Sequence, residues 1–270
     1  MSTARLAEEV RRLRGRRRRP AMPEDRVEFA RSVGLTPDAW QRDVLRSEAP
    51  RILLNCSRQS GKSTMAAVLA LHKALINPAA LVLILAPAER QAKELFSKVA
   101  EMYRTLGHPI PADSYRKMGV ELANRSRIEA LPGTERTIRG FSGADLLVVD
   151  EAARVEDALY YATRPMLAVS GGRLLMMSTP FGKRGVFYEE WSGGAGKGWE
   201  RYEVLASQCP RIPDVFLEEE RVALGPWWYA QEYECRFMDV NDQVFPTEAV
   251  DRAMSADVKP LFSASARRAL

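Results

Sequence analysis

The sequence predicts an α/β fold in which a mainly parallel central sheet is flanked by helices. Short runs of consecutive apolar residues alternate with longer segments of helical periodicity, and turn residues separate them. Strands that are buried on both faces read as continuous apolar runs, so helices are expected on both sides of the sheet. With 270 residues and 46% hydrophobic composition, the chain can bury a sizeable core.

Strands are predicted where short apolar runs are bounded by turn residues. They lie at Arg51–Cys56, Leu81–Ala86, Leu146–Val149 and Gly172–Ser178, with two shorter ones inside Val120–Leu131 and another at Arg201–Leu205. Helices are predicted at Pro37–Leu45, Gly61–Ile76, Glu89–Leu106, Val155–Pro165 and Phe216–Phe237, the last broken at Gly225-Pro226. Thr36 is expected to cap the first of these helices, with Pro37 at its first position.

Three segments are expected along the chain: a basic arm at 1–23, a folded domain at 24–245 and a tail or linker at 246–270. The arm contains a dense run of arginines within residues 11–20. Such a run repels itself and is expected to form a solvated helix or a flexible arm. It can grip nucleic acid, dock on a partner or serve as a basic tail with no single role, and the sequence leaves these open.

Composition excludes several classes of function. No apolar run approaches the length of a membrane span, and no signal-peptide core follows Met1, so we expect a soluble protein that acts inside the cell. The three cysteines form no CxxC pair, and with only two histidines a zinc, disulfide or histidine-based centre is not expected. The formal charge of +5 is compatible with a phosphate-backbone partner.

A phosphate-binding loop is predicted between the first strand and the helix that follows it. Residues 56–64 read CSRQSGKST and match the pattern GxxxxGK[ST], except that Cys56 replaces the first glycine. A loop that wraps a phosphate points its N–H groups inward, and the helix N-terminus adds positive potential. Gly61 permits the close approach of the backbone to the phosphates, Lys62 reaches the β- and γ-phosphates, and Ser63 coordinates Mg²⁺. The candidate ATP-binding residues of the loop are Ser57, Arg58, Gln59, Ser60, Gly61, Lys62, Ser63 and Thr64.

Arg58 is a second cation inside this loop and has two interpretations. It can touch the γ-phosphate or sense its loss, because the loop wraps a polyanion. It can also form a structural ion pair on the loop surface. The contact with the γ-phosphate is the favoured interpretation, and the only ground for it is that the loop wraps a polyanion.

A hydrolytic motif is predicted where Leu146–Val149 runs into two carboxylates. Asp150, at the strand tip, can hold Mg²⁺ directly or through water. Glu151 can polarise the attacking water as a general base. An apolar run followed by Asp-Glu is common by itself, but with a P-loop upstream the two form a Walker A and Walker B pair.

The spacing of the two motifs indicates a subclass of P-loop NTPase. Roughly ninety residues separate them, enough for an intervening strand and helix and one further strand. An intervening strand and a glutamate after the Walker B aspartate are marks of the additional-strand, catalytic-glutamate class. Helicases and translocases have this form, whereas small GTPases do not.

Several stretches, in order over most of the chain, resemble terminase large subunits, the motors that pump viral DNA into capsids. Trp40-Gln41 resembles the adenine-recognition element of helicases and terminases, which implies that the amide of Gln41 bonds the adenine edge. The loop SRQSGKST is similar to the terminase P-loop, in which an early arginine is typical. Ser178-Thr179 resembles the motif that couples phosphate loss to DNA movement, and its alternative is a capped turn.

Arg139 lies in a loop, Thr137–Ser142, that precedes the Walker B strand. We interpret it as an arginine finger that reaches the ATP of a neighbouring subunit and stabilises charge on the transferred phosphoryl group. A structural arginine or a DNA-backbone contact is the alternative. The candidate catalytic residues are therefore Glu151, Lys62 and Arg139, the metal ligands Ser63 and Asp150, and the coupling residues Ser178 and Thr179.

The resemblance implies an ATP hydrolase that uses Mg²⁺ to move double-stranded viral DNA, with sequence-independent contacts to phosphates. It also implies a ring homo-oligomer on the capsid portal, a small terminase subunit as partner, and a place in the host cytoplasm and transiently at the procapsid portal. Terminase large subunits usually carry a nuclease domain after the ATPase domain. No acid cluster follows Phe245-Pro246, so we expect no nuclease activity in this chain.

Two other functions remain as alternatives at this stage. One is the motor core of a helicase or restriction-type translocase, but such proteins normally have two tandem cores. No second strand–helix set of sufficient size follows residue 180. The other is a nucleotide-binding scaffold without hydrolysis, against which the presence of Glu151 argues.

Overall fold

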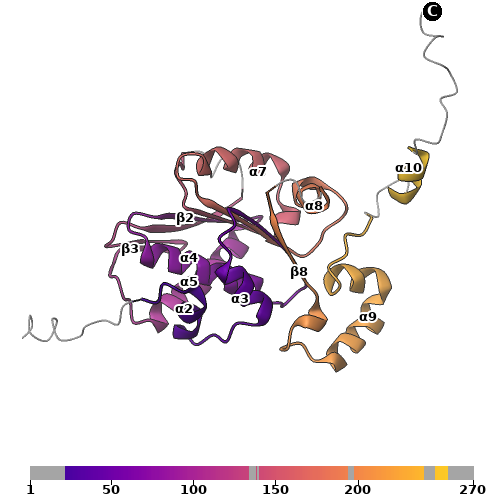
Figure 1. Cartoon of the computed structure of the whole chain (residues 1–270), viewed down its shortest axis with the longest axis horizontal. Helices are drawn as coiled ribbons and strands as arrows, with labels where there is room; N and C mark the ends of the chain where they lie inside the picture. Colours follow the sequence, from indigo (N-terminus) through magenta and orange to yellow (C-terminus); the bar gives the residue numbers. More distant parts are fainter. Residues whose placement is uncertain (1–21, 134–137, 139, 194–197, 240–246, 255–270) are drawn as a thin grey trace, which may run out of the picture.

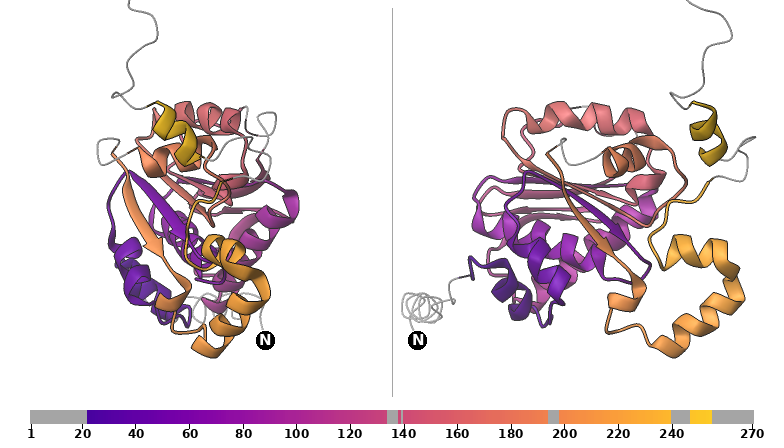
Figure 2. Two further views of the ribbon diagram at one scale, coloured as in Figure 1. Left: turned by 90° about the vertical axis from the view of Figure 1, so that its right-hand side faces the viewer. Right: turned by 45° about the vertical axis from the view of Figure 1, so that its right-hand side comes forward.

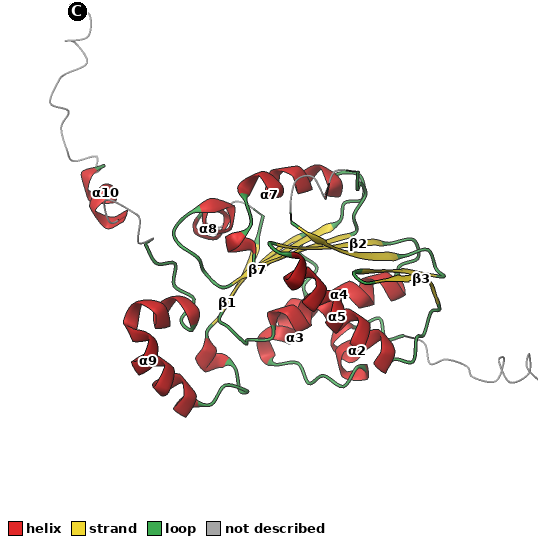
Figure 3. Cartoon of the chain, turned by 180° about the vertical axis from the view of Figure 1, so that it is seen from behind, coloured by secondary structure: helices red, strands yellow, loops and turns green. Residues whose placement is uncertain are grey.

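The computed structural model describes residues 22–133, 138, 140–193, 198–239 and 247–254. Its centre is a twisted sheet with helices on both faces (Figure 1). One face carries α2 (Arg26–Ser32), α3 (Ala39–Arg46), α4 (Lys62–Ile76) and α5 (Glu89–Thr105). The other face carries α7 (Asp157–Thr163) and α8 (Gly185–Ser192), as the view from behind also shows (Figure 3).

Within the described residues, eight strands form this sheet in the order β3-β4-β5-β2-β6-β7-β1-β8. Their bounds are β1 Arg51–Cys56, β2 Leu81–Ala86, β3 Ala112–Arg116, β4 Gly119–Leu122, β5 Arg127–Pro132, β6 Leu146–Asp150, β7 Arg173–Ser178 and β8 Glu200–Val204. Along this order, every pair of neighbouring strands from β5 through β2, β6, β7 and β1 to β8 is parallel. The pairs β3 with β4 and β4 with β5 are antiparallel. The mainly parallel α/β sheet predicted from the sequence is therefore confirmed.

Strand β7 occupies a special position in this order. It lies between β1, which leads into the predicted P-loop, and β6, which ends in Asp150. A strand inserted between these two is the mark of the additional-strand class. The intervening strand is thus one that follows the Walker B motif in sequence, whereas β2 lies on the far side of β6.

The alternation of side chains along each strand divides the interior into two cores. Ile52 and Leu54 of β1 and Val148 of β6 pack under α2 to α5. Leu53 of β1 and Leu147 of β6 pack under α7 and α8. Because both faces are covered, the central strands are apolar throughout, which explains the continuous runs in the sequence.

Three sequence predictions need correction. The first predicted helix, α3, begins at Ala39 with Asp38 as N-cap, so Thr36 and Pro37 lie outside it. Gln41 explains this start, because its Oε1 accepts a hydrogen bond from Asp38 N at 2.8 Å. The last long helix, α9 (Asp214–Glu232), ends before Phe237, although its break at Gly225 is confirmed. Strand β3 was not predicted because its sequence, ADSYR, is polar and largely exposed.

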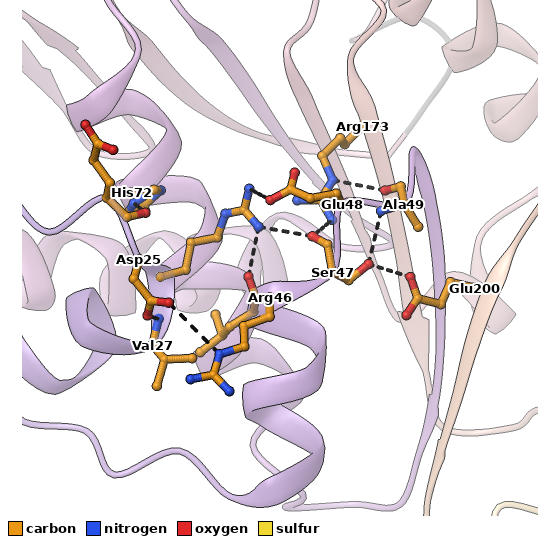
Figure 4. A network of polar contacts seen from close by, with 12 residues as sticks. Asp25, Val27, Arg46, Ser47, Glu48, Ala49, His72, Arg173 and Glu200 are labelled. Carbon is orange, nitrogen blue, oxygen red and sulfur yellow. Dashed lines mark hydrogen bonds and ion pairs between the residues drawn. The ribbon is translucent and has the colours of Figure 1, made fainter.

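A polar network at the amino ends of the strands fixes the connection between α3 and β1 (Figure 4). Arg173, at the start of β7, donates to the carbonyl oxygens of Ala49 and Ser47 at 3.1 and 2.8 Å. The Ser47 hydroxyl donates to Glu200 at the start of β8. Arg26 of α2 donates to the carbonyl oxygen of Ser47 as well, at 3.0 Å. These bonds hold β7, β8 and α2 to the short segment that joins α3 to β1, and they fix the position of α3.

The segment after β8 extends beyond the sheet. A 3-10 turn at Ala206–Gln208 leads into α9, which lies beside the β8 edge, and α10 (Thr247–Ala253) lies further out (Figure 2). The end of α9 returns to the sheet, because Ala206 N donates to Tyr233 O at 2.9 Å. Among the described helices, none has both the length and the apolar composition that a membrane span requires.

Gly172 should be intolerant of a side chain. A Cβ there would lie 1.9 Å from the carbonyl oxygen of Ala144, a backbone atom that cannot rotate away. We expect Gly172→Ala to lower the free energy of unfolding by about 3 kcal/mol, measured by urea denaturation. Gly171→Ala is the matched control, because a Cβ there meets nothing within 4 Å and only its φ of +62° is strained. That control should cost about 1 kcal/mol, and a larger loss there than at Gly172 would contradict the steric argument.

Candidate active site

The predicted P-loop lies between β1 and α4, at the carboxyl ends of the parallel strands. Gly61, the N-cap of α4, has φ of 95°, and Gln59 has φ of 56°. Cys56 is the last residue of β1 and is fully buried in the core, and its φ is not positive. A small apolar side chain therefore fits the position where the general pattern has its first glycine. Burial raises the pKa of the Cys56 thiol to about 12, so this cysteine stays neutral.

Part of the P-loop backbone is hydrogen-bonded to the rest of the fold, and part of it faces the candidate site. Ser57 N donates to Val204 O of β8 at 2.9 Å, and Arg58 N donates to Glu232 O at the end of α9 at 3.1 Å. The hydroxyl oxygens of Ser57 and Ser60 are buried. Thr64 N donates to Gly61 O at 3.1 Å, whereas the N–H groups of Lys62 and Ser63 precede the first carbonyl that the helix can offer. An anion would therefore be held by the second half of the loop and the start of α4.

The two Walker B carboxylates lie beside the P-loop lysine. Asp150 is 6% exposed at the end of β6 and accepts a hydrogen bond from Glu151 N at 2.9 Å. Burial, with the neighbouring Glu151 charge, raises the pKa of Asp150 to about 6, and Lys62 opposes this shift. Glu151 has φ of 50°, a left-handed conformation that is strained for a residue with a side chain. A buried acid with a raised pKa is one that a bound cation would stabilise in its charged form.

The side chain of Glu151 is surrounded by three groups. Its Oε1 is 3.5 Å from Lys62 Nζ, and its Oε2 is 3.0 Å from Arg154 Nη1. The Ser178 hydroxyl, at the end of β7, is 3.5 Å from Oε2. Thr179 is 2% exposed, and its hydroxyl is 3.3 Å from Arg154 Nη1. The structure thus brings Lys62 and Glu151, two of the three predicted catalytic residues, together with the predicted coupling residues Ser178 and Thr179 at one edge of the sheet.

A cavity of about 280 Å³ opens between these residues and α5. Its lining includes the predicted residues Arg58, Ser63, Asp150 and Glu151, and also Gln91, Glu94, Leu95 and Lys98. Ser63, the predicted magnesium ligand of the P-loop, and Asp150 therefore face the same space. Carboxylate and hydroxyl oxygens are the ligands that Mg²⁺ prefers, so the residues present fit this ion.

Gln41 is buried against the P-loop on the other side. It is 4% exposed, and a Cβ at Gly61 would lie 2.8 Å from its Nε2. Its Oε1 already accepts from Asp38 N, which leaves one lone pair and the amide N–H groups for a ligand. Arg211 closes this corner, since it donates to Ser60 O at 3.0 Å and pairs with Asp38 at 2.8 Å.

Arg58 is not free in this structure. Its guanidinium forms a hydrogen-bonded ion pair with the buried carboxylate of Glu232, which raises the pKa of Arg58. Asn55 Nδ2 donates to Cys235 O at 2.9 Å, so the end of α9 is attached to β1 as well as to the loop. This arrangement is the structural ion pair that was the alternative interpretation of Arg58, and a ligand would have to compete with it.

Sequence reasoning missed several residues of this site. Glu94 and Lys98 follow Gln91 on α5 by three and seven positions, a spacing that places all three on one helix face and could have been recognised. Arg154 likewise follows Glu151 by three residues. Arg211 and Glu232 left no local signal, because they lie 151 and 174 residues from their P-loop partners. Arg139 lies outside the described residues.

The sheet order and the converging motifs define a P-loop NTPase of the additional-strand, catalytic-glutamate class. Residues 53–252 match the family model described as the N-terminal part of the T4-like-virus-type terminase large subunit. The large terminase subunit of Thermus virus P23-45 is 32% identical over 83% of this chain and 53% of that protein. That of Escherichia phage T5 is 27% identical over 81% of this chain and 52% of that protein. The chain therefore belongs to the terminase large subunit family.

Solved structures agree on the fold. The large terminase ATPase domain of Thermus phage P74-26 has a TM-score of 0.68 at 23% identity, over 78% of this chain and 98% of that one. The large terminase of a thermophilic bacteriophage, solved in complex with ADP, has a TM-score of 0.65 at 12% identity, over 74% of this chain and 54% of that one. The chain spans about half the length of the curated relatives that it matches.

The raised pKa of Asp150 predicts a pH-dependent effect of Asp150→Asn. The folded pKa of about 6 exceeds the ordinary 3.8, so unfolding releases protons between these values. The free energy of unfolding therefore falls as pH rises through about 6. The amide avoids this loss and can still accept from Glu151 N. In metal-free buffer we expect a gain on the order of 2–3 kcal/mol at pH 8 and much less at pH 4.5.

Thermal melting of both proteins at the two pH values measures this difference. Asp43→Asn, at an exposed position of α3, is the control and should change little at either pH. Equal shifts at pH 4.5 and pH 8 for Asp150→Asn would contradict the assignment of Asp150 as a carboxyl that is hard to ionise without a cation.

Proposed function

We propose that this chain is the ATPase motor domain of a packaging terminase, which hydrolyses ATP to move double-stranded viral DNA into a capsid. The convergence of Lys62, Asp150 and Glu151 beside one cavity at the carboxyl edge of the sheet carries the proposal. Membership of the terminase family favours it over the helicase or restriction-type translocase. The motor domain would occupy about the region predicted from the sequence, 24–245.

ATP would bind with its adenine at Gln41 and its phosphates on the P-loop. Lys62 would leave the carboxylate of Glu151, 3.5 Å away, for the β- and γ-phosphates. The loop residues Ser57–Thr64 would supply the remaining contacts, chiefly through the start of α4. Arg58 would reach the γ-phosphate only by leaving Glu232, so its interaction there would report whether that phosphate is present.

Ser63 and Asp150 would hold Mg²⁺, which neutralises charge that develops on the phosphates during hydrolysis. Glu151 would take a proton from the attacking water through the carboxylate oxygen that faces the P-loop. Ser178 and Thr179, which adjoin Glu151 and Arg154, would transmit the loss of the γ-phosphate to the segment after β7. Whether that segment moves DNA stays a prediction.

The partners follow from the same proposal. DNA would be held through phosphates without regard to sequence, so its binding should weaken steeply with salt. The subunits would form a ring on the capsid portal, with the small terminase subunit as a further partner in the host cytoplasm. The expectation that nuclease activity is absent from these 270 residues also stays a prediction.

Glu151→Gln tests the hydrolytic role directly. The amide cannot accept the proton, so steady-state phosphate release should fall by about 10²- to 10⁴-fold. The affinity for ATP, measured by calorimetry, should change only a few-fold, because the P-loop is intact. Glu156→Gln, at an exposed position nearby, is the matched control and should keep the parent rate. Parent-like phosphate release from Glu151→Gln would leave a nucleotide-binding scaffold as the better explanation.

Arg139→Ala tests completion of the site by a neighbouring subunit. This variant should bind ATP but not hydrolyse it, because the arginine stabilises only the transition state. Mixing Arg139→Ala with Glu151→Gln should restore activity if each subunit supplies what its neighbour lacks. Mixing Arg139→Ala with the double variant Arg139→Ala/Glu151→Gln is the control and should restore none. If the first mixture also stays inactive, or turnover per subunit is unchanged by dilution, the arginine does not act in trans.

A further inference from the structure

The two carboxylate oxygens of Glu151 have different surroundings. Oε1 faces Lys62 Nζ at 3.5 Å, on the side of the P-loop. Oε2 contacts Arg154 Nη1 at 3.0 Å and the Ser178 hydroxyl at 3.5 Å. When Lys62 moves to the phosphates, Oε1 loses its partner, whereas Oε2 keeps Arg154. The Ser178 hydroxyl stays near Oε2, but it donates its one hydrogen to Thr179 O at 2.7 Å. One oxygen is then available to a water molecule, and the other is held by the protein.

Arg154 is itself fixed by three contacts in addition to its side-chain ion pair with Glu151. Its backbone N–H donates to Glu151 O at 2.8 Å in the 3-10 turn that follows β6, at Ala152–Arg154. The same Nη1 that meets Glu151 is 3.3 Å from the Thr179 hydroxyl. Its guanidinium lies 4.5 Å from the ring centre of Phe181, two residues further along. A planar guanidinium stacked on a ring has few orientations available to it.

These contacts connect two separate parts of the site. Glu151 and Arg154 follow β6, whereas Thr179 and Phe181 follow β7. An exposed ion pair would contribute little, but the Arg154 and Glu151 side chains are only 26% and 20% exposed. A displacement of the segment after β7 would therefore move Arg154 and, with it, the carboxylate of Glu151.

We propose that Arg154 is the positioning residue of Glu151 and that it ties the orientation of this carboxylate to the segment Thr179–Phe181. The inference rests on the proposed function, in which Glu151 activates water. A base that is oriented by a third group needs that group for geometry, and small misplacements of reacting groups slow a reaction strongly. Arg154 is not among the residues that line the cavity beside the P-loop.

Arg154→Ala should therefore lower kcat for ATP hydrolysis by about 10- to 100-fold. KM and the affinity for the slowly hydrolysed analogue ATPγS should stay within about threefold of the parent values, because Lys62, Ser63 and Gln41 are unchanged. Arg154→Lys keeps the charge but not the stacked plane, so it should restore part of kcat. A merely structural arginine would not give this separation of kcat from KM, nor the partial rescue.

Phe181→Ala tests the connection to the segment after β7. Removal of the ring should lower kcat in the same direction and by less, since Arg154 keeps its contact with Thr179. The double variant Arg154→Ala/Phe181→Ala should be no slower than Arg154→Ala alone, because the ring acts through the arginine. Independent, multiplying effects of the two substitutions would overturn the connection.

Arg221→Ala is the matched control. Arg221 also lies over an aromatic ring, that of Tyr229 at 4.8 Å, but it belongs to α9 and does not line the nucleotide cavity. It should keep the parent kcat. Thermal melting of every variant checks folding, and Arg154→Gln, which keeps most of the side-chain length, replaces Arg154→Ala if that variant is unfolded.

The outcomes separate this inference from the proposed function. If Glu151→Gln is inactive but Arg154→Ala and Arg154→Gln keep or exceed the parent kcat, Arg154 does not position the base and the inference fails alone. The same conclusion follows if only KM changes. If Glu151→Gln is as active as the parent protein, the proposed function fails first.

Discussion

The position of β7 between β1 and β6 is the constraint on which the rest of the site depends. Neighbouring strands lie about 4.8 Å apart, so one inserted strand separates the P-loop strand from the Walker B strand by roughly 10 Å. This gap places Lys62 within 3.5 Å of Glu151 while Ser63 and Asp150 line one cavity. The inserted strand also brings Ser178 to Glu151.

The candidate site is assembled at some expense to stability. Asp150 is buried enough to resist ionisation, and Glu151 adopts a left-handed backbone conformation. Groups held in this way persist when the surrounding structure determines them, and strain of this kind is concentrated at functional sites. Here one apolar core packs on each face of β6, so the end of this strand has little freedom to relax. A ligand that supplies positive charge at Asp150 would bind the folded state more tightly than the unfolded one and so stabilise it.

The sequence was sufficient for the central strands and for the motifs at their ends, because each depends on neighbouring residues. The bounds of β1 and β2 agree with the predicted runs, since strands covered on both faces must be apolar throughout. It was insufficient where a contact joins distant segments. Glu232 shows no local pattern, yet it takes the side chain of Arg58 from 174 residues away. Capping was also misjudged: the pair Asp38 and Gln41, three residues apart, is a capping-box pattern that the sequence shows, and only the pairing of Asp38 with Arg211 joins distant segments.

The attachment of α9 to the P-loop connects the candidate nucleotide site to the outer part of the chain. Arg58 holds Glu232 twice, through its guanidinium and through its backbone N–H. Only the first of these bonds can be exchanged for a phosphate, because the second belongs to the main chain of the loop. Loss of the side-chain bond would leave a buried carboxylate without its cation, which is unfavourable. Exchange of the side-chain bond would therefore favour a displacement of the end of α9. The backbone bond between Arg58 N and Glu232 O would limit the size of that displacement.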